Sequence, residues 1–299
     1  MLILKNYLVL FTAIAVSYTL SGCKDNTGSN HPHVAESSLS TDPESRLGWK
    51  LGAQAYTFNR FTFFEALDKI DSCGLKFVEA YPEQEIGGGI PGKMDYHMDV
   101  TVRGKVLKKL KDKGITLFAY GVVSPDGEEN WRKLFEFVKA IGAKTITSEP
   151  SEKDLPIVSR LCDQYEINVA IHNHPFPKHY WNPDSTLSAI KGQSARVGVC
   201  ADVGHWTRSG LNAVECLKIL QGHVLQLHMK DLNYKQGPDD GAEDRDVHWG
   251  TGIVNVRGVI DELKRQHFQG MLSVEYERNW DNNVPDVIAS VQYFRKALD

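Results

Sequence analysis

The stretch from Val197 to Trp206, VGVCADVGHW, decides how the rest of the chain is interpreted. It begins with an apolar run, Val197 to Ala201, which is typical of a strand buried on both faces of a sheet. It continues with Asp202 and His205, a carboxylate and an imidazole three residues apart. Such groups cost free energy at the end of a buried strand unless something pairs with them. The stretch therefore predicts a strand that delivers polar side chains to a functional site.

Outward from this strand, strand-like and helix-like patterns alternate from Leu47 to the end of the chain. We predict strands at 51–58, 77–81, 115–123, 144–149, 168–174, 197–201, 224–231 and 271–277. Helices are predicted at 62–73, 102–113, 131–141, 155–166, 186–191, 212–220, 256–267 and 284–298. Eight strand–helix units in about 250 residues predict a (β/α)₈ TIM barrel, an α/β fold with a parallel sheet. An open doubly wound sheet is the alternative, but no Gly-x-Gly-x-x-Gly follows the first strand.

The N-terminal segment has a different pattern from the barrel. One lysine, Lys5, precedes an apolar run from Tyr7 to Val16, and Leu20-Ser21-Gly22-Cys23 follows it. This pattern indicates a secretory signal, and its end resembles a bacterial lipobox with Cys23 as the lipidated residue. We therefore predict a lipoprotein signal peptide at 1–23, a flexible linker at 24–46 and the barrel at 47–299. The expected location is the cell envelope, with membrane contact only through the lipid anchor; a plain signal peptide or an uncleaved anchor is the alternative.

Composition limits the classes of partner. The 299 residues are 41% hydrophobic and 24% charged, which is ordinary for a globular protein, and the net charge of -4 argues against nucleic-acid binding. A small carbohydrate is the expected partner, and a homo-oligomer is left open.

The remaining cysteines have apolar neighbours, so we predict buried free thiols at Cys73, Cys162, Cys200 and Cys216.

Several other predicted strands also end in polar residues, and in a barrel these ends meet at one mouth. The set is Glu79, Tyr81, Glu149, His172, His174, Asp202, His205, His228, Lys230, Asp231, Glu275 and Glu277. Three carboxylates and one imidazole stand out among them: Glu149, Asp202, His228 and Glu275. Carboxylates that lie close together cannot all stay ionised without a cation. Oxygen-rich ligation with one nitrogen suits a single Mn²⁺, Mg²⁺, Co²⁺ or Zn²⁺.

Four motifs carry a resemblance to a known family. They are SEP at 148–150, DVGHW at 202–206, LHMKD at 227–231 and SVEYE at 273–277. Together they resemble the sugar phosphate isomerase/epimerase family of xylose isomerase-like TIM barrels, over Leu47 to Asp299. The resemblance implies that the four residues named above hold one divalent metal, that Glu149 and Glu275 also act as an acid/base pair, and that His205 orients a substrate hydroxyl.

Further substrate contacts are predicted at Glu79, Tyr81, His174, Lys230 and Trp249. Some alternatives stay open. Glu275 and Glu277 point the same way, so Glu277 could be the ligand instead. Glu79 could form a structural salt bridge, and Lys230 could pair with Asp231.

Two reactions fit this site. The first is sugar isomerisation or epimerisation, in which a carboxylate removes the proton next to a carbonyl and the metal stabilises the enediolate. The second is a lyase or hydratase that cleaves 3-keto-glycosides by β-elimination with the same metal and base. A non-catalytic sugar-binding lipoprotein is the alternative of another class. We find no Gly-x-x-x-x-Gly-Lys-Ser/Thr loop for a phosphate.

Overall fold

The structure is a computed structural model that describes residues 42–233 and 246–299. The predicted signal peptide, Cys23 and most of the predicted linker lie outside the described residues. Within the described ranges, no helix combines the length and the apolar character needed to cross a membrane.

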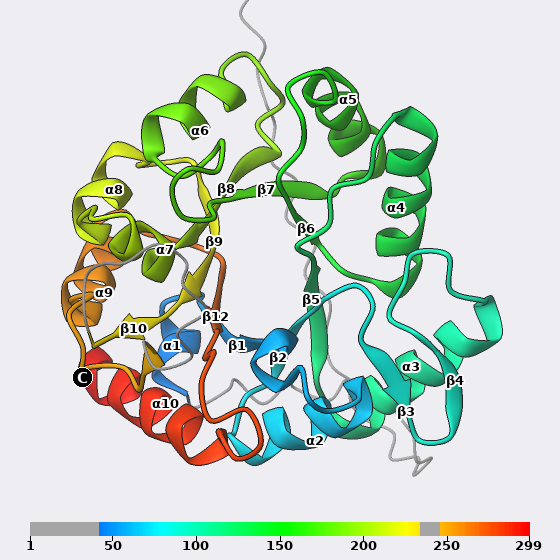
Figure 1. Ribbon diagram of the computed structural model, residues 1–299, viewed down its shortest axis with the longest axis horizontal. Coiled ribbons are helices and arrows are strands. Elements are labelled where there is room, and N and C mark those ends of the chain that lie inside the picture. The colour runs from blue at the N-terminus through cyan, green and yellow to red at the C-terminus, as the bar shows by residue number, and fades with distance from the viewer. Residues whose placement is uncertain (1–41, 234–245) are drawn as a thin grey trace, which may run out of the picture. The chain divides into compact units, whose positions relative to one another are not determined.

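The predicted fold class is confirmed, because eight parallel strands close into a barrel (Figure 1). Their order around the barrel is β1-β12-β9-β8-β7-β6-β5-β2. The bounds are β1 Lys50–Gln54, β2 Phe77–Ala80, β5 Thr116–Tyr120, β6 Thr145–Ser148, β7 Asn168–His172, β8 Val197–Asp202, β9 Val224–Met229 and β12 Met271–Val274. The register sets Asp202 on β8 beside His228 on β9, and His228 beside Ser273 on β12. Polar residues at the ends of these three strands are therefore neighbours.

Helices surround the strands (Figure 1). Their bounds are α1 Pro43–Arg46, α2 Phe63–Ser72, α3 Val100–Lys113, α4 Glu128–Ile141, α5 Leu155–Tyr165, α6 Pro183–Ile190, α7 Val203–Arg208, α8 Ala213–Ile219, α9 Val256–Arg265 and α10 Val284–Leu298. Helix α2 illustrates why these segments are helical. Thr62 and Glu65 form a reciprocal capping box at its start, and Phe63, Leu67 and Ile70 are buried at helical spacing. This face packs into the apolar core between helices and barrel.

The structure differs from the sequence prediction at several boundaries. The predicted strand 51–58 divides into β1 and a 3₁₀ helix, η1 (Ala55–Phe58). The long loop after β2 contains a hairpin of β3 (Glu85–Gly87) and β4 (Ile90–Lys93), which lies against α2. Helix α7, which was not predicted, starts directly after β8 because the side chain of Asp202 accepts a hydrogen bond from the His205 backbone N–H. The polar loop after β9 contributes a short pair, β10 (Asp231–Leu232) and β11 (Asp246–Val247).

The predicted linker extends too far toward the barrel. Pro43–Arg46 form α1 rather than linker, and Glu44 is only 3% exposed. Its carboxylate pairs with the Arg295 guanidinium at 2.8 Å on helix α10. A buried bidentate ion pair fixes this segment to the barrel domain, which therefore begins before Leu47.

The four predicted thiols, at Cys73, Cys162, Cys200 and Cys216, are buried and free.

Candidate active site

Three predicted metal ligands lie together at the carboxyl ends of β8, β9 and β12. Asp202, His228 and Glu275 each place one ligand atom within 4.8 Å of the others. His228 Nδ1 is 3.1 Å from Glu275 Oε2. Asp202 Oδ2, His228 Nδ1 and Glu275 Oε2 are buried, and their charged neighbours include one another and Lys230, whose Nζ is 3.2 Å from Asp202 Oδ2 and 3.1 Å from Glu275 Oε2. Two carboxylate oxygens and one imidazole nitrogen are a donor set that suits a divalent cation.

Glu79 orients the ring of His228 from below. Its Oε2 atom is 2.8 Å from His228 Nε2, and both side chains are almost completely buried. An ionised carboxylate only accepts hydrogen bonds, so Nε2 donates its proton to Glu79 and Nδ1 is the ring atom turned toward Glu275. Burial works to lower the pKa of His228, but Cys200, Glu79 and Glu275 hold it well above its usual value, so Nδ1 must give up a proton before it can bind a cation. A carboxylate behind a histidine is the usual arrangement around a metal ligand. Glu79, predicted to contact substrate, is therefore assigned to positioning His228, because its carboxylate is fully buried beneath the ring.

Lys230 supplies the fixed positive charge at the centre. Its Nζ is 3.2 Å from Asp202 Oδ2 and 3.1 Å from Glu275 Oε2, and it also contacts Glu277 Oε1. The side chain is fully buried, and Gly204 leaves room for it, because a Cβ there would come within 2.7 Å of Lys230 Cβ. Burial works to raise the pKa of Glu275, but Lys230 and His228 lower it to about 2.

The position of Lys230 bears on two alternatives left open by the sequence. Lys230 pairs with Asp202, Glu275 and Glu277 and points away from Asp231, whose carboxylate instead accepts backbone hydrogen bonds from Gly250 and Gly252. Neighbouring residues of an extended chain point to opposite faces, which explains the separation. Glu275, and not Glu277, belongs to the group of three donors around His228.

Glu149 lies on the other side of the mouth. It follows β6, which is four places from β12 in either direction around the barrel, so it faces Glu275 across the opening. Its Oε1 is 3.2 Å from His172 Nδ1 and also contacts His174 Nδ1. Burial works to raise the pKa of Glu149, but these two histidines lower it to about 2. His172 links the two halves of the site, since its Nε2 is 3.6 Å from Asp202 Oδ2.

A cavity of about 440 Å³ opens beside Glu275, His172 and His174. Its lining is Gln54, Tyr56, Tyr81, Pro82, Val122, His172, His174, His205, Arg208, Glu275 and Glu277. The predicted substrate contacts Tyr81, His174 and His205 are in this lining. Burial lowers the pKa of His205 well below its usual value, which favours a neutral imidazole able to hydrogen-bond a hydroxyl.

Trp249 lies elsewhere than predicted. It is buried, its backbone N–H donates to Ser290 Oγ at 3.1 Å, and its ring lies 5.8 Å from that of Phe294 on α10. Trp249 therefore packs under α10 and is not part of the cavity lining.

The sequence prediction missed Arg208, Gln54 and Tyr56. Arg208 follows His205 by three residues, so recognition of helix α7 would have placed both on one face. Its guanidinium lies 2.7 Å from Asp246 Oδ1 and 3.7 Å from Glu277 Oε2.

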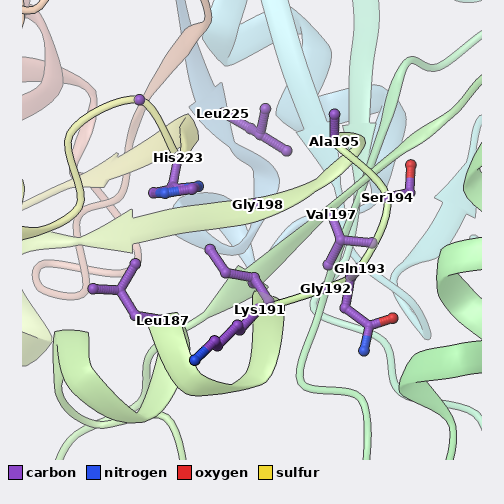
Figure 2. A pocket seen from close by; sticks show the side chains of 12 residues that line it. Leu187, Lys191, Gly192, Gln193, Ser194, Ala195, Val197, Gly198, His223 and Leu225 are labelled. Atoms are coloured by element: carbon purple, nitrogen blue, oxygen red, sulfur yellow. The ribbon is translucent and has the colours of Figure 1, made fainter.

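A second cavity, of about 510 Å³, lies at the opposite ends of β8 and β9. Figure 2 shows its lining, which runs from Leu187 and Lys191 at the end of α6 to Val197 and Leu225 at the beginnings of the two strands. His223 is the histidine in this lining, and no carboxylate is among the lining residues. The cavity over Glu275 is the better candidate for catalysis because the ionisable groups gather there.

Comparison with known proteins agrees with the fold. The family described as xylose isomerase-like TIM barrel matches residues 67–297. An inosose dehydratase from Mesomycoplasma hyopneumoniae strain 7448 is 22% identical over 259 residues, which cover 73% of this chain and 83% of that protein. Uncharacterized protein MJ1311 from Methanocaldococcus jannaschii is 24% identical over 148 residues, 48% of this chain, and the match spans only 46% of that protein's length.

Solved structures share the barrel. An uncharacterized protein from Parabacteroides distasonis is 35% identical, with a TM-score of 0.68, over 83% of this chain and 99% of that one. A D-tagatose 3-epimerase-like protein is 16% identical, with a TM-score of 0.64, over 83% and 97% of the two chains. The IolI protein, solved with a zinc atom, is 16% identical, with a TM-score of 0.66, over 83% and 98%.

Proposed function

This chain belongs to the xylose isomerase-like TIM barrel family, and from that premise we propose that it is a divalent-metal-dependent isomerase or epimerase of sugars. The observation that carries the proposal is the cluster of three buried ligand atoms, on Asp202, His228 and Glu275, which lie within 4.8 Å of one another. The zinc atom in the IolI protein, which shares the fold, and the epimerase-like neighbour are consistent with it.

The metal would be held by Asp202, His228 and Glu275, with Glu149 as the fourth ligand from the facing side of the mouth. When bound, a divalent cation would polarise a sugar carbonyl and acidify the neighbouring C–H group. The ion is Mn²⁺, Mg²⁺, Co²⁺ or Zn²⁺ by donor type. The contact between Glu79 and His228 Nε2 keeps Nδ1 turned toward the cluster, where a bound metal would replace its proton.

Glu149 and Glu275 are the acid/base pair in this proposal. They face each other across the barrel mouth, so a sugar bound between them presents one ring face to each carboxylate. Both have a pKa of about 2, so both are ionised at neutral pH and able to accept a proton. One removes the proton next to the carbonyl. The other takes up a proton from water and returns it to the opposite face of the same carbon. His205 and His174 line the cavity where sugar hydroxyls would lie.

An uncharged carbohydrate suits this mouth better than a phosphorylated one. The ionisable groups around it include the carboxylates of Glu149, Asp202, Glu275 and Glu277. The fixed cations among them are Lys230 and Arg208, and both already pair with carboxylates. With a divalent cation bound, these positive charges only balance the four carboxylates, so no surplus positive charge is left for a phosphate.

A lyase is the second candidate. The dehydratase among the relatives favours it, because dehydration also begins with proton removal next to a carbonyl. In a 3-keto-glycoside, the same step would expel the glycosidic oxygen if that oxygen lies β to the ketone. His174, whose side chain is 41% exposed beside Glu149, is placed to protonate the leaving oxygen.

Proton NMR in D₂O tests the proposal and separates the two reactions. The protein would be incubated with Zn²⁺ or Mg²⁺ and a panel of ketoses and 3-keto-glycosides. Deuterium entering a carbon next to the carbonyl with the aglycone retained supports the isomerase or epimerase. Aglycone release with a new vinylic signal supports the lyase. No exchange with metal bound would refute both and favour a sugar-binding protein.

We also propose that residues 1–23 direct the chain to the cell envelope and that Cys23 carries the lipid anchor. The support is the LSGC sequence at 20–23. Cys23→Ala should abolish labelling by radioactive palmitate and move the protein out of the membrane fraction. Unchanged labelling would refute the assignment of Cys23.

A further inference from the structure

Three aromatic rings stand at one side of the mouth, and the acid/base chemistry does not use them. They are Tyr56, Tyr81 and Trp280, from the ends of the neighbouring strands β1, β2 and β12. The Tyr56 ring is 5.2 Å from that of Tyr81 and 5.9 Å from that of Trp280, edge to face in both pairs. They form a continuous aromatic wall next to Glu275 and Glu277, with Tyr56 and Tyr81 in the cavity lining.

The 3₁₀ helix η1 directs the side chain of Tyr56 toward solvent. In η1, Ala55, Thr57 and Phe58 are completely buried, whereas Tyr56 is 41% exposed. Its backbone N–H donates to Gln54 Oε1 at 3.1 Å. Among the described residues, Tyr56 is the one exposed large apolar side chain that lines this cavity.

The backbone on both sides of the wall is anchored as well. Thr57 Oγ1 donates to the Val274 carbonyl at 3.3 Å and accepts from the Tyr276 N–H at 3.1 Å. Asn283, beyond Trp280, donates to the Thr57 carbonyl at 2.5 Å. A ring kept in water on a rigid segment costs hydrophobic free energy, and a ligand can recover that free energy.

We propose that Tyr56, Tyr81 and Trp280 form a second subsite that stacks against an uncharged pyranose ring attached to the reacting sugar. This inference rests on the proposed function for the position of the reacting ring. A pyranose has an apolar C–H face that packs on an aromatic ring, and its hydroxyls can reach the tyrosine O–H groups at the wet edge. Burial raises the pKa of Tyr81 to about 12, so its O–H stays a donor at neutral pH.

The subsite changes the expected substrate class. A free monosaccharide fills only the space over Glu149 and Glu275, whereas a disaccharide-sized glycoside also covers the wall. The substrate is then a glycoside with a sugar aglycone. A flat aromatic aglycone would stack in a similar way, so the test compares glycosides that carry a sugar aglycone with one that carries an aromatic aglycone.

Isothermal titration calorimetry on the full chain in EDTA tests the subsite without any turnover. The probes are glucose, cellobiose, maltose and 4-nitrophenyl β-glucoside. The first three are reducing sugars that an isomerase could convert, so EDTA is present to remove the metal that the proposed reaction needs. We expect at least one disaccharide to bind about tenfold more tightly than glucose. Tyr56→Ala or Trp280→Ala should remove that difference and leave the glucose affinity unchanged, whereas Tyr56→Phe, which keeps the ring, should retain it.

Phe176→Ala is the matched control. Phe176 is 66% exposed in the loop after β7, the strand opposite β1 in the barrel, and it does not line the cavity. It should leave the disaccharide advantage intact. Equal affinities for all four probes, or a disaccharide advantage that survives both Tyr56→Ala and Trp280→Ala, would overturn the subsite. Tighter binding of the nitrophenyl glucoside alone would overturn the choice of a pyranose. These outcomes are independent of the deuterium exchange that decides the reaction.

Discussion

Replacement of Glu79 by glutamine tests how the proposed metal centre is built. Glu79 Oε2 is 2.8 Å from His228 Nε2 and 3.0 Å from Gln226 Nε2, and the side chain is completely buried. Glutamine has the same shape, so packing is kept, but the negative charge that fixes the imidazole is lost. If the new amide turns its NH₂ group toward Nε2, the ring proton moves to Nδ1 and blocks the proposed ligand atom.

The expected effect is a loss of about 10–100-fold in metal affinity, because an outer partner of a ligating histidine is lost. The free energy of unfolding should fall by no more than about 1.5–3 kcal/mol, the contribution of one hydrogen bond to a charged group. Competition for Zn²⁺ with a fluorescent chelator measures the affinity, and circular dichroism measures the melting temperature. Glu44→Gln is the control, because it neutralises another buried carboxylate that lies far from the site against Arg295. An unchanged Zn²⁺ affinity for Glu79→Gln would refute the positioning role.

Three further changes test other parts of the account. Glu149→Gln and Glu275→Gln should each lower turnover by about 10²–10⁴-fold, because general acid–base catalysis contributes that much. Steady-state kinetics measures the turnover. Full activity in both variants would contradict the assignment of these two residues as the acid/base pair. Lys230→Met should destabilise the metal-free protein by about 3–5 kcal/mol, because it leaves buried carboxylates without their cation. Zn²⁺ should then raise the melting temperature more in this variant than in the wild type. An equal rise in both proteins would contradict the role of Lys230 as the positive charge beside these carboxylates. Leu263→Ala, in the fully buried face of α9, should cost about 2–5 kcal/mol in urea denaturation, and a loss below about 1 kcal/mol would contradict the packing.

The barrel and the residues at its strand ends could be predicted because both depend on short-range patterns. Apolar runs followed by polar residues identify parallel strands and their carboxyl ends, and closure of the barrel then brings those ends together. The structure places Asp202, His228 and Glu275 side by side because β8, β9 and β12 are neighbours. That neighbourhood follows from the order of the strands along the chain.

The orientation of individual side chains could not be predicted in this way. The strand pattern predicts Glu79 as a substrate contact because its strand ends at the mouth, but the contact of its carboxylate with His228 depends on the register of the barrel. Trp249 lies in a loop without periodicity, so its packing against Phe294 had no sequence signal. Tyr56 belongs to a segment with strand-like residues, and the 3₁₀ turn that exposes its ring is set by the Gln54 side chain.

The most direct test of the metal centre is an anomalous diffraction measurement at the zinc absorption edge, on crystals of the protein grown with Zn²⁺. We predict a single strong peak among Asp202, His228 and Glu275, within about 2.0–2.2 Å of their oxygen and nitrogen ligand atoms. The same measurement on Asp202→Ala should lose most of the peak. A wild-type crystal with no peak at this position, or with its strongest peak elsewhere in the barrel, would contradict the account.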